Sequence, residues 1–171
     1  MEAYKESGSG LLALPHLDGK AYAAASLSGS AVSLVAGSLL FGIVLSDPGF
    51  MLRVNASLLM GPAVIPATAG NPPQVLLAGL LVHFVLGFVY AGLIVVVIHR
   101  WGMAVGLVGG ALLGLALYLI GVYSISYFFP WIYPLRNWML LVTHLILGGL
   151  VGAVYELLDE YDLPFPAASE A

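Results

Sequence analysis

Apolar positions fill four long stretches of the chain, and polar positions gather in the gaps between them and at the two ends. The stretches are residues 21–45, 75–98, 101–129 and 138–158. A helix needs about 20 apolar residues to cross a hydrocarbon core of about 30 Å. Lipid offers no partner to a backbone amide, so each stretch must be helical. The pattern predicts an all-α integral membrane bundle of four helices.

The same pattern divides the chain into three parts. Residues 1–20 carry mixed charges and a Gly/Ser stretch at 7–10, which predicts a flexible N-terminal arm. Residues 21–158 form the predicted transmembrane domain. Residues 159–171 form a predicted acidic C-terminal tail.

The connections between the spans carry further signals. Residues 50–60 are apolar apart from three positions, which predicts a short helix lying in the membrane interface. Residues 128–137 are rich in aromatic side chains and proline, as is typical of the belt at the water boundary. His99 and Arg100 leave room only for a tight turn, so the second and third spans should be antiparallel neighbours.

Composition agrees with a membrane protein and excludes several functions. The chain is 61% hydrophobic and 8% charged, whereas soluble domains are about 45–50% apolar and about 25% charged. It has no cysteine, which excludes disulfides and thiolate metal sites, and its net charge of −4 argues against nucleic-acid binding. No predicted span has an acidic residue except near its end. We therefore expect the protein to have no catalytic activity of its own.

Basic residues give a weak orientation signal. Lys5, Lys20 and Arg100 fall on one side of the predicted bundle, and Arg53 and Arg136 fall on the other. Cytoplasmic loops carry an excess of Lys and Arg. The bias predicts that both termini are cytoplasmic.

Three matches in the same order suggest an internal duplication. The segments Ala31–Leu40 and Ala104–Leu113 are identical at seven of ten positions. Two shorter matches follow in the same order: Leu52-Arg53 with Leu135-Arg136, and His83–Gly87 with His144–Gly148. We interpret the chain as two parallel two-helix repeats related by an axis along the membrane normal. This would place His83 and His144 at equivalent depths.

Ionisable groups inside a span are costly and are functional candidates by default. Two histidines on facing helices can hold a b-type haem, with a glycine one turn further on leaving room for the macrocycle and arginines near the propionates. The residues of this hypothesis are His83, His144, Gly87, Gly148, Arg53 and Arg136, with the two histidines as iron ligands. The alternatives are that each imidazole bonds a neighbouring carbonyl or hydroxyl and fixes helix packing, or that the pair serves proton transfer or a non-haem metal.

Glycines recur every four residues in the third span, at Gly102, Gly106, Gly110 and Gly114. Small residues at this spacing let helix backbones approach closely. The line predicts either packing of the first span on the third or a face for self-association or for other membrane subunits. We expect His16, His99 and the acidic end at 156–162 to be solvated.

Two sequence segments resemble a known group of proteins. Phe129-Pro-Trp-Ile-Tyr-Pro-Leu-Arg-Asn-Trp138 followed by His144-Leu-Ile-Leu-Gly148, and Gly61-Pro62 followed by His83-Phe-Val-Leu-Gly87, resemble small uncharacterised bacterial four-helix membrane proteins. These proteins are often loosely labelled sodium/proline symporters. The resemblance implies the four-helix architecture and a bacterial cytoplasmic membrane, and it assigns no catalytic residue.

Two classes of function follow as expectations. The first is a non-catalytic membrane subunit of a larger energy-transducing complex, such as a respiratory or electron-transfer assembly, in contact with lipids and other subunits. The second is a small oligomeric channel or transporter with a histidine-lined path. A purely structural membrane scaffold is a third alternative.

Overall fold

The four predicted spans are all helical. The computed structural model describes residues 17–159, so most of the predicted arm and tail lie outside the described part. The long helices are α1 (Gly19–Leu45), α3 (Pro73–Ile98), α4 (Met103–Phe128) and α5 (Trp138–Asp159). Each is long and apolar enough to cross a membrane. Residues 17–159 contain no strand, and the all-helical membrane bundle is confirmed.

Shorter helices fill the connections. The predicted short helix is present as α2 (Phe50–Met60), followed by the single turns η1 (Pro62–Val64) and η2 (Ala67–Ala69); η3 (Pro130–Leu135) precedes α5. About half of α2 is buried, because one side of it packs against α3 and α1. This helix therefore closes one end of the bundle in addition to any contact with the membrane surface.

Helix starts follow local chemistry. The carboxylate of Asp18 accepts hydrogen bonds from the backbone N–H groups of Lys20 and Ala21 and caps α1. Helix α3 begins at Pro73, where the missing N–H costs nothing. The side chain of Asn137 accepts from the N–H of Leu140 and starts α5.

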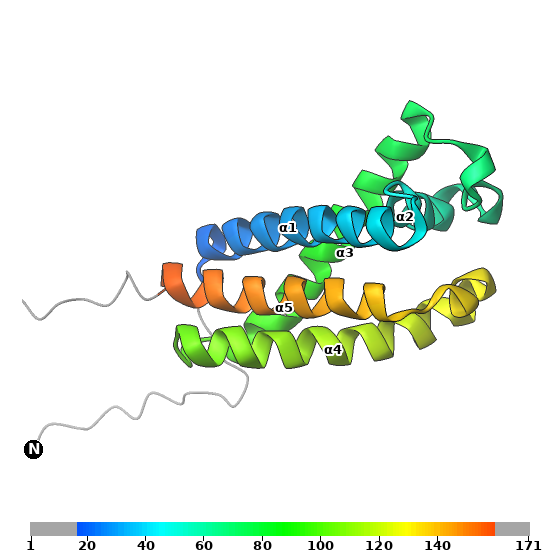
Figure 1. Cartoon of the computed structure of the whole chain (residues 1–171). Helices are drawn as coiled ribbons and strands as arrows, with labels where there is room; N and C mark the ends of the chain where they lie inside the picture. Colours follow the sequence, from blue (N-terminus) through cyan, green and yellow to red (C-terminus); the bar gives the residue numbers. More distant parts are fainter. Residues whose placement is uncertain (1–16, 160–171) are drawn as a thin grey trace, which may run out of the picture.

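Helix α5 is the centre of the bundle. In Figure 1, α1, α5 and α4 run side by side in that order, and α3 crosses them obliquely. The contacts of α5 with α4 and with α1 are much more extensive than those of α3 with any spanning helix. The predicted neighbours α3 and α4 do touch, but their contact is small.

Glycines bring α4 and α5 into backbone contact. A Cβ atom added at Gly110 would overlap the carbonyl oxygen of Gly148, and one added at Gly114 would overlap that of His144. At Gly106 the added atom would lie 2.6 Å from the carbonyl oxygen of Gly152. Three of the four glycines of the predicted line therefore pack against α5 of the same chain.

The prediction that the glycine line joins the first span to the third is wrong. Helix α1 lies on the other side of α5, and its own small residues face α5 and α2: Gly29 lies against Leu147 and Val151, and Gly37 lies against Met51. The reason is that Gly148 and Gly152 of α5 face α4, whereas α1 approaches another side of α5 through its own Gly29. Gly102 precedes α4 in a positive-φ turn and takes no part in the line.

The duplication stays a prediction. Helices α1 and α4 run in one direction and α3 and α5 in the other (Figure 1), as a parallel repeat requires. The interfaces differ, however. Gly148 lies against Gly110, whose counterpart in the repeat is Gly37, but Gly87 lies against Ser30, about two turns away.

We predict that Gly110→Ala destabilises the protein by about 3 kcal/mol, the upper part of the range for overpacked sites, because the added methyl group meets a backbone carbonyl that cannot rotate away. The measurement is thermal unfolding in detergent. Gly109→Ala is the matched control, since its Cβ would meet its nearest neighbour, Ile98, at an ordinary 3.7 Å. Equal melting temperatures of the two variants would contradict the α4–α5 contact.

Candidate functional site

A cavity of about 110 Å³ brings the two predicted histidines together. It lies between the helices in the half of the bundle that contains α2 and η3, and the five α-helices and η3 all contribute to its wall. His83 reaches it from α3 and His144 from α5. The sequence prediction that the two residues face a common space is consistent with this arrangement.

Both ring nitrogens of His83 have partners. Its Nε2 lies 2.9 Å from the carbonyl oxygen of Ser30, and its Nδ1 lies 3.4 Å from Nδ2 of Asn55. A carbonyl only accepts, so Nε2 carries the hydrogen and Nδ1 accepts from Asn55. The side chain is 8% exposed. His83 therefore joins α3 to α1 and α2, as the packing alternative predicted.

His144 is held differently. Its Nδ1 donates to the carbonyl oxygen of Leu140 at 2.7 Å, one turn earlier on the same helix. Its ring lies between two tyrosines, with centroid distances of 5.8 Å to Tyr90 and 5.3 Å to Tyr118. Among residues 17–159 its Nε2 has no hydrogen-bond partner. The neutral ring thus presents a lone pair at Nε2.

The cavity is closed toward the chain termini by an apolar cluster. Helices α1, α3 and α5 build this cluster with the buried residues Ala21, Ala25, Ala91, Ile94, Val95, Ile98, Leu147, Val151 and Tyr155. Leu147 belongs both to the cluster and to the cavity wall. At the opposite end, the indole N–H of Trp131 in η3 donates to Ser57 of α2 at 3.1 Å. A second apolar cluster of Phe41, Met51 and Met139 also lies at this end, so apolar side chains flank the cavity on both sides.

The other residues of the haem hypothesis have different roles. Gly87 lines the cavity, but Ser30 occupies the place where its side chain would lie, and Gly148 lies against the α4 backbone. A cavity of about 110 Å³ is also smaller than the roughly 150 Å³ that accommodates benzene. The arrangement does not fit a haem; that hypothesis stays a prediction, and we derive no function from it.

The two arginines of that hypothesis are bound elsewhere. Arg53 is 1% exposed and pairs with Asp47, while its Nε donates to the Ile65 carbonyl oxygen at 3.0 Å and its Nη1 to Asn71 at 2.8 Å. It fixes the loops on both sides of α2. Arg136 lies over the ring of Tyr133, 3.6 Å from the centroid.

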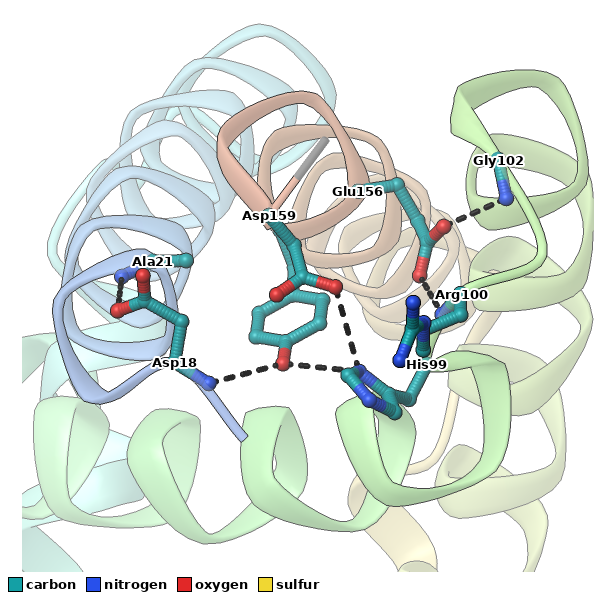
Figure 2. Close-up of polar contacts among 8 residues, drawn as sticks. Asp18, Ala21, His99, Arg100, Gly102, Glu156 and Asp159 are labelled. Atoms are coloured by element: carbon teal, nitrogen blue, oxygen red, sulfur yellow. Dashed lines mark hydrogen bonds and ion pairs between the residues drawn. The ribbon is translucent and has the colours of Figure 1, made fainter. Parts of the chain in front are cut away.

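A second polar cluster ties the helix ends together beside the termini (Figure 2). The hydroxyl of Tyr155 accepts from the Asp18 N–H at 3.3 Å and lies 3.1 Å from Nδ1 of His99. The same nitrogen lies 3.4 Å from Asp159. Hydrogen bonds from the backbone N–H groups of Ala21 and Lys20 hold the pKa of Asp18 below its ordinary value of 3.8. The cluster joins the start of α1, the end of α3 and the end of α5.

Glu156 belongs to this cluster and caps α4. Its carboxylate accepts from the N–H groups of Arg100 at 2.8 Å and Gly102 at 2.5 Å, as Figure 2 shows. It is 3% exposed. The predictions that Glu156 and His99 are solvated are therefore wrong, because Glu156 binds the turn between α3 and α4 and His99 contacts Tyr155 of α5. His16 and residues 160–162 lie outside the described residues.

Sequence reasoning missed Asn55, Tyr90 and Tyr118 as cavity residues. A polar or aromatic residue within an apolar segment can indicate a cavity residue. The direction in which its side chain points, however, depends on how its helix, here α2, α3 or α4, is rotated in the bundle. That rotation follows from tertiary packing and not from hydrophobic periodicity, since lipid-facing and buried positions are equally apolar.

Comparisons of the chain with protein-family models, curated proteins and solved structures found no match. The proposed function therefore rests on the geometry of the cavity.

We predict that Glu156→Gln destabilises the protein by about 1–3 kcal/mol, because an amide leaves one of the two capped N–H groups facing another donor. Chemical unfolding in mild detergent measures this loss. Asp159→Asn serves as the control, since it weakens only a longer pair and should cost no more than about 1 kcal/mol. A smaller loss for Glu156→Gln than for Asp159→Asn would contradict the capping role.

Proposed function

We propose that this protein is a small membrane transporter that binds a small solute between His83 and His144. The observation that carries the proposal is the shared cavity, which has polar groups from several helices although the surroundings are apolar. Such a cavity inside a membrane bundle is the default position of a substrate site. A purely structural bundle gains nothing from unpaired polar groups there.

Apolar side chains at both ends of the cavity support a transporter over an open channel. Toward the termini the cavity ends at the cluster around Ile94 and Val151, both fully buried. Toward α2 and η3 it is flanked by the wall residues Val54, Leu58 and Ile132 and by the cluster of Phe41, Met51 and Met139. A site that apolar barriers separate from both sides of the membrane suits alternating access, because each barrier can open in turn.

One argument for the subunit hypothesis no longer supports it. The glycine face that suited docking is occupied, since Gly106, Gly110 and Gly114 are buried against α5 of the same chain. We therefore favour the transporter among the functions that the sequence left open.

Access to the cavity can be tested with single cysteines, since the natural chain has none. Ser33 lines the cavity and is 1% exposed, and Ser26, about two turns earlier on the same side of α1, is 0% exposed and does not line it. We expect Ag⁺ added to proteoliposomes to block Ser33→Cys at least about tenfold faster than Ser26→Cys. The readout is the loss of later maleimide labelling in denaturant.

The side of access sharpens the test. With access from each side in turn, Ag⁺ added to either side of the membrane should block Ser33→Cys faster than Ser26→Cys. If Ser33→Cys is blocked from neither side faster than Ser26→Cys, the cavity has no aqueous access and the transporter proposal fails.

A further inference from the structure

The polar groups around the cavity are mostly hydrogen-bond acceptors. The hydroxyl of Thr143 donates to the Leu140 carbonyl oxygen at 2.8 Å, and that of Ser33 donates to Ser30 at 3.0 Å. The hydroxyl of Tyr118 donates to the carbonyl oxygen of Asn137 at 3.1 Å. Each hydroxyl has one hydrogen, so all three can only accept from a ligand.

The histidines add to this bias. His83 has both nitrogens engaged, and His144 presents only the lone pair of Nε2. Asn55 gives one amide hydrogen to His83 and keeps one donor and its acceptor oxygen. Tyr90 is the one tyrosine of the cavity wall whose hydroxyl has no partner among residues 17–159, and it lies beside Gly121, another wall residue. The Tyr90 hydroxyl can therefore donate to a ligand next to the His144 ring.

Charge and size restrict the ligand further. Among residues 17–159, no Asp, Glu, Lys or Arg lines the cavity. A charged ligand would lose its hydration without gaining an opposite charge. The cavity volume of about 110 Å³ is below the roughly 150 Å³ of a cavity that holds benzene. The ligand must be uncharged, have only a few non-hydrogen atoms and carry more donors than acceptors.

We propose that the cavity binds ammonia or a small primary amine in its uncharged form. The amine donates to Nε2 of His144 and to a hydroxyl oxygen of the wall, and its own lone pair accepts from Tyr90. A short alcohol brings a single donor and two lone pairs, so it matches this wall less well. This inference rests on the proposed transport function and names its substrate class.

The test is nitrogen-15 NMR of histidine-labelled protein in lipid nanodiscs, with methylamine as the probe. We expect the His144 Nε2 resonance to shift saturably on addition of methylamine, whereas the His83 resonances stay in place because both nitrogens are already paired. Trimethylamine has no N–H and should leave His144 unchanged. No shift with methylamine, or the same shift with trimethylamine, would overturn the amine proposal.

Two further measurements identify the bound form. Tyr90→Phe removes the donor but keeps the ring and should weaken methylamine binding about three- to tenfold. Tyr127→Phe, which changes an exposed side chain, should not weaken it.

The titratable groups of the wall are His83, His144, Tyr90 and Tyr118. At constant total methylamine, the apparent affinity should rise about tenfold from pH 7.5 to 8.5. The fraction of an alkylamine present as the free base rises by that factor when its pKa is about 10.4.

An apparent affinity that does not change with pH would mean that the ammonium form binds, which contradicts the proposal. The outcomes also separate the two proposals. Fast blocking of Ser33→Cys without a methylamine shift leaves the transporter and removes the amine. Slow blocking removes the transport function itself.

Discussion

The contact between the backbones of α4 and α5 is the constraint on which the rest of this bundle depends. At Gly110 and Gly148 the two helices meet without intervening side chains, so no larger residue fits at either position. In a membrane, helices gain no hydrophobic advantage from each other over lipid, and close packing of this kind is a main source of association. The position of α5 then sets the positions of α1 and α3.

The cavity follows from this unequal packing. Helix α1 also approaches α5 closely, through Gly29, but α3 crosses obliquely and meets its neighbours over shorter lengths (Figure 1). Large side chains, including Tyr90 and Tyr118, bridge the wider space without filling it. Most polar residues within that space have at least one partner, as His83 does through Ser30 and Asn55, and the Tyr90 hydroxyl is the exception among the described wall residues.

Sequence reasoning predicted the helices well and their contacts poorly. The number of spans, the short helix over residues 50–60 and the inward position of both histidines were predictable, because chain length against bilayer thickness and the cost of buried polar groups are local properties. The partner of the glycine line was not predictable, since α1 and α5 both carry small residues. The burial of Glu156 was not predictable either, because an acidic residue at the edge of a span usually meets water.

The cap that Glu156 provides has a consequence for biogenesis. When α4 first leaves the ribosome, the N–H groups of Arg100 and Gly102 have no acceptor, because their partner lies 54 to 56 residues further along the chain. Each of these amides would be costly to place in lipid without a partner. The N-terminal side of α4 is therefore completed only when α5 packs beside it, because the acceptor for these amides is a side chain 54 to 56 residues further along the chain.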